Sequence, residues 1–161
     1  KFLMDSLLFK NIELNVNWSP ELDVPVSRLP KSAGIYAEIH WRSHGVRIGE
    51  SVNIKYRIAQ ATGWFKGMHN GTEHPNQLRR NNIFCQAAKR DGHEGFSHYV
   101  VSTDSRLHDK ELRKEVEFFL FDWVASHALY KDFNFQKGYR NTLGFENLID
   151  AEMHKSKYQS P

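Results

Sequence analysis

Apolar and polar residues alternate along positions 34 to 51, which is the pattern of strands with one buried face. A short polar segment at 42–45 interrupts the alternation, so we expect a β-hairpin with strands at about 34–41 and 46–50. The apolar face of this hairpin would carry Ile35, Ala37, Ile39, Val46 and Ile48.

The opposite face of the predicted hairpin is polar. With the turn at 42–45, three pairs of directly opposite residues share this face: His40 with Arg47, Glu38 with Gly49, and Tyr36 with Ser51. A slip of one residue would set apolar side chains against the polar ones, so the alternation favours this register.

The spacing of apolar residues changes to a helical period after the hairpin. Ser51 predicts the N-cap of a helix over about 52–61. The buried stripe of this helix would consist of Ile54, Ile58 and Ala61. Three glycines then predict a loop over 62–76. A second helix would cover 76–90 and end at Asp91-Gly92.

A third strand is predicted at 95–102 and a long helix at about 109–128. The apolar face of this helix would carry Leu112, Val116, Phe119, Leu120, Trp123 and Val124. Residues 1–30 read as an extended lead-in packed on the domain, and 136–161 as a C-terminal tail. This order of elements predicts an α+β domain with a small three-stranded, mainly antiparallel sheet flanked by helices.

Composition places the chain among single-domain globular proteins, with 161 residues of which 40% are hydrophobic. We expect no membrane partner, because no stretch approaches the roughly eighteen apolar residues of a membrane span. Lys1–Phe9 is interrupted by Asp5 and reads as a packed terminus, not a signal peptide. The lone Cys85 fits a reducing, cytoplasmic compartment and is expected in the core. With His93 and His98 it matches no strong zinc pattern.

Positive charge is concentrated in one part of the chain. The span 41–90 holds nine Lys and Arg against two acids, whereas the whole chain has a net charge of +3. A basic segment inside a folded domain suggests a polyanion as partner, although an ordinary solvated surface would have the same composition. Tyr36 and Arg47 of the hairpin would lie near the start of the helix that contains Arg57. A helix start beside a tyrosine and two arginines is suited to binding phosphate.

Two short motifs in this region, Gly34-Ile35-Tyr36 and Arg47-Ile48-Gly49, are separated by ten residues. They resemble the signature of the GIY-YIG nuclease superfamily, in particular its small phage and bacterial endonucleases. The flanking segments "LPKSAGIY" and "ESVNIKYR" also resemble the family, and the second places Arg57 at the position of the family's catalytic arginine.

Two later segments extend the resemblance. "EVEFFLF" resembles the family's glutamate motif and selects Glu117, with Glu115 as the rival on the same helix. "KDFN" resembles the segment that ends in the family's asparagine and selects Asn134, with Asn141 as the rival. The resemblance covers about residues 29 to 135 and implies a nuclease domain over 31–135.

The resemblance implies an endonuclease that hydrolyses DNA phosphodiesters with one divalent metal ion. Tyr36 would be the general base, with its pKa lowered from about 10 by Arg47 or by the metal. Arg57 would stabilise the transition state. Glu117 would hold Mg²⁺ or Mn²⁺, which prefer oxygen ligands, and Asn134 would brace the site.

One position departs from the family. Arg47 stands where the family usually has tyrosine, so either the arginine takes over a phosphate contact or the site is altered and less active. The residue that completes the phosphate site would be Arg80, with His69 and His74 as alternatives.

The basic span would contact the DNA backbone, through substrate-binding residues Lys55, Lys66, His69 and Arg79. Any sequence preference would come from the loop 62–76, the second helix and the tail after 134. A homodimer would allow both strands of a duplex to be cut. The alternatives are a catalytically impaired nucleic-acid-binding module with the same scaffold, and a nuclease directed at RNA.

Overall fold

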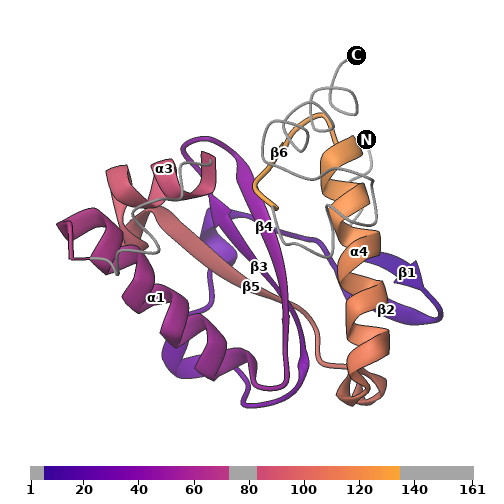
Figure 1. The fold of residues 1–161 in the computed structure, drawn as a ribbon. Helices are drawn as coiled ribbons and strands as arrows, with labels where there is room; N and C mark the ends of the chain where they lie inside the picture. Colours follow the sequence, from indigo (N-terminus) through magenta and orange to yellow (C-terminus); the bar gives the residue numbers. More distant parts are fainter. Residues whose placement is uncertain (1–5, 73–82, 135–161) are drawn as a thin grey trace.

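The computed structural model describes residues 6–72 and 83–134, and its fold is α+β (Figure 1). Four of the described strands form one sheet in the order β5-β3-β4-β6, and two form a separate hairpin. The sheet strands are β3 (Gly34–His40), β4 (Gly45–Ser51), β5 (Phe96–Ser102) and β6 (Lys131–Asp132). The hairpin consists of β1 (Ser6–Phe9) and β2 (Ile12–Asn15). The α+β class is therefore confirmed, but a single three-stranded sheet is not.

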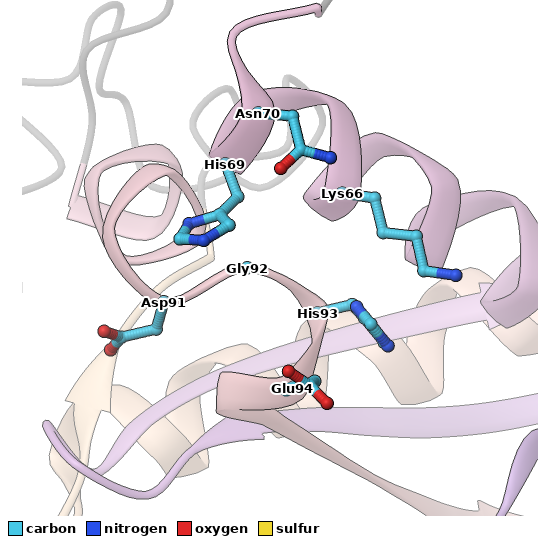
Figure 2. A pocket seen from close by; sticks show the side chains of 7 residues that line it. All are labelled: Lys66, His69, Asn70, Asp91, Gly92, His93 and Glu94. Atoms are coloured by element: carbon cyan, nitrogen blue, oxygen red, sulfur yellow. The ribbon is translucent and has the colours of Figure 1, made fainter.

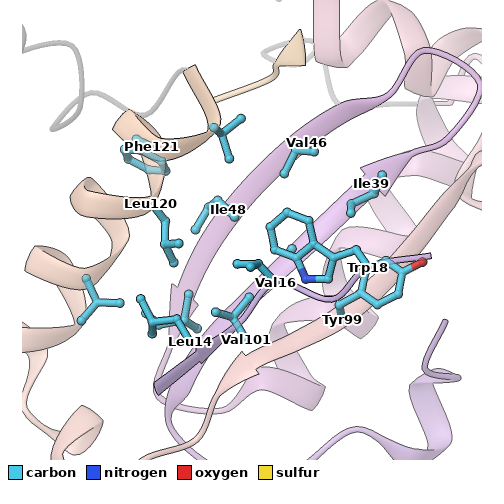
Figure 3. Packing of buried hydrophobic residues seen from close by; sticks show 14 of the residues in the cluster. Leu14, Val16, Trp18, Ile39, Val46, Ile48, Tyr99, Val101, Leu120 and Phe121 are labelled. Carbon is cyan, nitrogen blue, oxygen red and sulfur yellow. The ribbon is translucent and has the colours of Figure 1, made fainter. Parts of the chain in front are cut away.

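The three described α-helices lie on both sides of the four-stranded sheet: α1 (Ile54–Asn70), α3 (Ile83–Asp91) and α4 (Lys110–Ser126). Figure 1 shows α1 and α3 on one face and α4, with the β1–β2 hairpin behind it, on the other. Because strand side chains alternate between faces, the apolar residues of β3 and β4 face α4. Figure 3 shows this core, in which Leu120 and Phe121 of α4 pack over Ile48.

The central hairpin differs from the predicted register by two residues. Its turn covers 41–44, and the observed pairs on the polar face are His40 with Gly45, Glu38 with Arg47, and Tyr36 with Gly49. Gly45 is part of β4 and pairs with His40, and the ring of Phe133 packs directly on it and leaves no room for a side chain. An even shift keeps every side chain on its predicted face, so the separation into an apolar and a polar face is correct.

Helix α1 is longer than the sequence predicts. Asn53, not Ser51, is its N-cap and accepts a hydrogen bond from the backbone N–H of Tyr56 at 3.0 Å. The helix continues through the predicted loop to Asn70, because Phe65 and Met68 extend its buried stripe at helical spacing. Burial of these two side chains outweighs the cost of about 1 kcal/mol for each glycine in the helix interior.

Other elements agree more closely with the predictions. Helix α3 ends before Gly92, which has a φ of 69°, and β5 and α4 lie within two residues of their predicted bounds. Asp109 caps α4, since its side chain accepts a hydrogen bond from the N–H of Glu111. Cys85 is buried in the core, as predicted.

The N-terminal lead-in contains a hairpin that the sequence analysis did not predict. Lys10 and Asn11 turn the chain with positive φ values of 52° and 64°, which is the geometry of a two-residue hairpin turn. Phe9 stacks on Phe119 of α4 with ring centroids 4.7 Å apart, and Leu14 lies in the core that α4 covers. Across the described ranges, no helix has the length and apolar character needed to cross a membrane.

Candidate active site

Tyr36 lies at the centre of the polar face of the sheet. Its side chain is fully buried and packs with Ile54 and Ile58 of α1. The phenol ring lies over Gly49 on the neighbouring strand and fills the space that a Cβ there would need. The hydroxyl group makes no close hydrogen bond with a described residue, although Arg47 is near enough to act on it. The ring of Tyr36, in the first motif, is therefore the reason why only glycine fits at position 49, in the second motif.

Arg47 lies beside the phenol, on the same face of β4. Its Nη1 donates to Oε1 of Glu38 at 2.7 Å, and its guanidinium carbon is 5.3 Å from the ring centroid of Phe84. Glu38 is fully buried and pairs on its other side with His98 of β5. Burial opposes ionisation of Glu38, but His98 and Arg47 outweigh it and hold the pKa of this carboxyl below its usual value.

The charges around Tyr36 act in opposite directions. Burial raises the pKa of the phenol above its usual value, and Glu38 raises it further. Arg47, and more weakly Arg57, lower that pKa but do not outweigh the burial. The two arginines are therefore the described groups that favour the phenolate.

Arg57 is placed by the second turn of α1 and is half-buried. Its guanidinium makes no hydrogen bond or ion pair with any residue in the described ranges, although it is close enough to act on Tyr36. A half-buried arginine without a protein partner is available for an anion such as phosphate. Tyr36, Arg47 and Arg57 are thus brought together, as the sequence analysis expected.

Glu117 lies on the inner side of α4 and is almost fully buried. Its Oε1 has no hydrogen-bond partner in the described part of the chain, and its nearest described cation is Lys114, with Nζ 3.8 Å away. Burial raises the pKa of this carboxyl to about 7, against the opposing effect of Lys114. Glu50 raises the pKa further, and Arg47 and the backbone of Glu50 lower it.

The nuclease site implied by the resemblance requires Tyr36, Arg57 and Glu117 to surround one pocket, and the position of Glu117 departs from that arrangement. Helix α4 covers the face of the sheet opposite to the phenol, so Tyr36 and Glu117 approach β4 from different sides. Glu117 lies near the outer edge of β4, where the backbone of Glu50 acts on it. Arg47, whose charge lowers the pKa of both Tyr36 and Glu117, is the described residue that links them.

Asn134 also lies at the outer edge of β4. Its Oδ1 accepts a hydrogen bond from the N–H of Ile48 at 2.7 Å, and its backbone and side-chain N–H groups donate to Asp132 at 2.8 Å. Asn134 is buried and ties the end of β6 to the strand that carries Arg47. These bonds agree with a bracing role, while its rival Asn141 lies outside the described residues.

A second acid near Glu117 was not identified from the sequence. Glu50 accepts a hydrogen bond from Nε of Arg113 at 2.8 Å and is 3.3 Å from Nζ of Lys114. Burial opposes ionisation of Glu50, but these two cations hold its pKa below the usual value. The rival acid Glu115 is half-exposed and pairs with Lys10 at 2.6 Å, away from this cluster.

Two predicted substrate-binding residues lie at the other end of α1. Figure 2 shows Lys66 and His69 beside a pocket of about 250 Å³, which Asn70, Asp91, Gly92, His93 and Glu94 complete. Along the helix axis, Lys66 is about 14 Å and His69 about 18 Å from Arg57. They do not join the Tyr36 site. The nearer Lys55 donates to the carbonyl of Ser27 at 3.2 Å.

Several candidates are not part of the site in the described structure. Arg79, Arg80 and His74 lie outside the described residues. His40, on the polar face, contacts Ser43 at 2.6 Å and Asp91 at 2.5 Å and so fastens the hairpin turn to the end of α3. The sequence analysis did not identify Glu38 and His98 as site residues. Each is on a predicted strand, but only the pairing of β3 with β5 shows that they are neighbours.

Among the described residues of the site, Glu117 is the one whose carboxylate is suited to bind a hard divalent cation. No group of three His, Cys, Asp or Glu side chains able to hold a metal occurs in residues 6–72 and 83–134. Mg²⁺ is commonly held by one or two carboxylates, with water and substrate phosphate as its other ligands. Oε1 of Glu117, which is buried and has no hydrogen-bond partner among the described residues, is suited to be such a ligand.

The chain matches none of the protein-family models, curated proteins or solved structures with which it was compared. Its function must therefore be inferred from the side chains described above.

Proposed function

We propose that this protein is an endonuclease of the GIY-YIG type, which hydrolyses DNA phosphodiester bonds with one divalent metal ion. The observation that carries the proposal is the proximity of Tyr36 to Arg47 and to Arg57, whose guanidinium has no partner in the described ranges. The same three residues stand at the motif positions of the sequence resemblance. A phenol near two cations, at the start of a helix, is suited to a phosphate group and to proton removal from water.

In this proposal Tyr36 acts as the general base. Its phenolate would take a proton from the attacking water, and the positive charge of Arg47 stabilises that phenolate against the burial that raises the pKa of the phenol. Because Arg47 is bonded to Glu38 and faces the phenol, its role is to stabilise the phenolate and not to contact the phosphate. Of the roles that the sequence suggested for Arg47, this is the lowering of the pKa of Tyr36 and not the phosphate contact.

Arg57 has the complementary role. Its guanidinium would bind a non-bridging oxygen of the scissile phosphate and stabilise the negative charge that grows there in the transition state. Glu117 would supply the protein ligand to a metal ion, which when bound would polarise the phosphate and stabilise the leaving oxygen. Because Glu117 and Tyr36 approach β4 from different faces, this role requires the phosphate to reach both side chains around the outer edge of β4. Asn134 would keep the outer edge of β4 in place through the hydrogen bond that it accepts from the N–H of Ile48.

The outer surface of α1 supports a nucleic acid as substrate. The helix contains no acidic residue and carries Lys55, Arg57 and Lys66. Tyr56 and Trp64 are 66% and 41% exposed on the same helix. Exposed aromatic rings among basic side chains are suited to stacking on bases while the cations bind the phosphate backbone.

One observation favours a second function, that of a catalytically impaired nucleic-acid-binding module. Tyr36 is fully buried, so water and phosphate reach its hydroxyl only if neighbouring side chains move. A protein in which they do not move would bind DNA through the basic surface without cutting it. The proposed nuclease therefore requires an opening of the site when DNA binds.

A plasmid-nicking assay in Mg²⁺ or Mn²⁺ separates the two functions. We expect nicking by the wild-type protein, none in EDTA, and none by Tyr36→Phe or Glu117→Gln, with DNA affinity retained in both variants. Glu115→Gln is the matched control, because Glu115 is on the same helix but exposed, and it should cut normally. DNA binding without cutting in any metal would show that the protein is a nucleic-acid-binding module. Cleavage of RNA but not of DNA would show that the nuclease is directed at RNA.

A further inference from the structure

Unpaired polar atoms are concentrated around Tyr36. Among the described residues, four of the buried side-chain atoms without a hydrogen-bond partner belong to neighbouring residues: Tyr36 Oη, Glu38 Oε2, Arg47 Nε and His98 Nε2. Buried polar groups in native proteins are rarely left without partners, since an unsatisfied group is destabilising. These atoms belong to residues that act on one another, since Glu38 Oε2 is 3.6 Å from His98 Nε2 and Arg47 acts on the phenol of Tyr36, so the four residues form one loosely bonded polar cluster.

Three of these residues form a single row across the sheet. His98 on β5, Glu38 on β3 and Arg47 on β4 are directly opposite one another. Glu38 is the middle member, and Tyr36 is on the same face two residues earlier, over Gly49. Any movement of Arg47 along this row therefore changes its distance to the phenol.

The two carboxylate oxygens of Glu38 are used differently. Oε1 accepts the hydrogen bond from Arg47 at 2.7 Å, whereas Oε2 is 3.6 Å from Nε2 of His98. The second distance is too long for a hydrogen bond but short enough to keep the carboxylate from turning away. His98 itself is fixed by its backbone, whose N–H donates to Asp23 at 2.7 Å and whose carbonyl accepts from Val24 at 3.0 Å.

Arg47 is also held from the other side. Its guanidinium lies near the ring of Phe84, so it is confined between an aromatic ring and the carboxylate of Glu38. Removal of Glu38 would leave a buried cation free to turn, because it would lose its described ion-pair partner. The orientation of the guanidinium toward the phenol thus depends on Glu38.

We propose that Glu38 is a positioning residue, which fixes Arg47 against the hydroxyl of Tyr36, and that His98 supports Glu38 from the opposite strand. Glu38 touches neither substrate nor metal in this proposal and acts only through Arg47. Its consequence for catalysis rests on the proposed function, whereas the positioning of Arg47 can be measured without any nuclease activity.

Hydrogen exchange of the Arg47 Nε–H group, measured by NMR on the full ¹⁵N-labelled chain, tests the positioning directly. Glu38→Ala should speed this exchange at least tenfold, because the guanidinium loses its anchor. Glu38→Gln should change it much less, because the amide oxygen still accepts from Nη1. Glu94→Ala, which removes an exposed carboxylate from the same side of the sheet, should have no effect. If a thermal melt shows that Glu38→Ala does not fold, Glu38→Asp replaces it in the comparison, because its shorter side chain moves the carboxylate oxygens away from Arg47.

Nicking rate and DNA affinity, measured on the same variants, complete the test. Faster exchange in Glu38→Ala, with a tenfold or greater loss of nicking at unchanged affinity and rescue by Glu38→Gln, supports the proposal. Unchanged exchange in Glu38→Ala overturns it. Faster exchange with full nicking overturns the catalytic importance of the positioning. If the wild-type protein does not nick DNA at all, the proposed function fails, and the exchange result alone decides whether Glu38 positions Arg47.

Discussion

Tyr36 and Gly49 are directly opposite each other on β3 and β4, and the phenol ring of the tyrosine lies on the glycine. No larger residue fits at position 49 without displacing the ring. Arg47 lies on β4 two residues before Gly49. The position of the phenol ring over Gly49 therefore also sets its distance from the guanidinium of Arg47. The two motifs of the sequence are therefore parts of one packed unit.

Gly49→Ala is the most direct test of this packing. The added methyl group would overlap the ring of Tyr36, and we expect a loss of about 1–3 kcal/mol in the free energy of unfolding. Nicking should fall with it, because the phenol moves from Arg47. Urea denaturation and the nicking assay measure the two effects.

Gly63→Ala is the matched control for that variant. Position 63 lies inside α1, and a Cβ built there meets no atom within 4 Å. Alanine should stabilise the helix by up to about 1 kcal/mol and leave nicking unchanged. Equal destabilisation by both substitutions would contradict the close packing of Tyr36 on Gly49.

The polar face of the central hairpin was predictable because it depends only on alternation, which survives a register error of two residues. The length of α1 was not predictable from its glycines, since burial of Phe65 against Phe96 and Phe84 decides it. The hairpin β1–β2 was missed because its apolar residues alone are equally typical of a packed terminus. Its position depends on a long-range contact, the stacking of Phe9 on Phe119.

For the candidate site, local motifs identified Tyr36, Arg47 and Arg57, which are close in sequence. Glu38 was on the predicted polar face, but its partner His98 is sixty residues later on a strand whose register no local pattern fixes. The sequence also gave no indication that α4 would bring Glu117 to β4 from the face opposite to the phenol. Long-range pairing was thus the missing information in both cases.

Glu117 should make stability depend on pH. Burial raises the pKa of this carboxyl to about 7, above its value in an unfolded chain, so the folded state binds its proton more tightly. Its contribution is therefore fully favourable below about pH 4 and is lost as pH rises through 7, by an amount on the order of 3 kcal/mol. Glu117→Gln should remove this loss in metal-free urea denaturation series between pH 5 and 8.

Mg²⁺ provides a second measurement on the same residue. If the ion binds Glu117, it displaces the proton, and the apparent affinity should rise with pH up to about 7. The metal should also restore part of the stability that the wild-type protein loses near neutral pH, but not in Glu117→Gln. Equal stabilisation of both proteins by Mg²⁺ would place the ion elsewhere.

Arg57 should be dispensable for folding and essential for cutting. Its guanidinium has no partner in the described part of the chain, so Arg57→Ala should change the melting temperature little. Loss of a charge that stabilises the transition state should lower nicking by about 10²–10³-fold, with a smaller loss of DNA affinity. Lys55→Ala, one position from the start of the helix, is the control and should mainly weaken binding. A normal nicking rate in Arg57→Ala would remove this residue from the mechanism.

Tyr56 and Trp64 should contribute to DNA binding through the exposed surface of α1. Stacking on a base is worth about 1–3 kcal/mol, so each alanine variant should weaken binding of a short single-stranded oligonucleotide by roughly 5- to 100-fold. Fluorescence anisotropy at several salt concentrations measures this, and the salt dependence should stay the same because no cation is removed. Leu129→Ala is the matched control, since Leu129 is 70% exposed but follows α4 on the other side of the sheet. If Tyr56→Ala and Trp64→Ala instead abolish self-association and leave DNA binding intact, the surface is a contact between two copies of the chain.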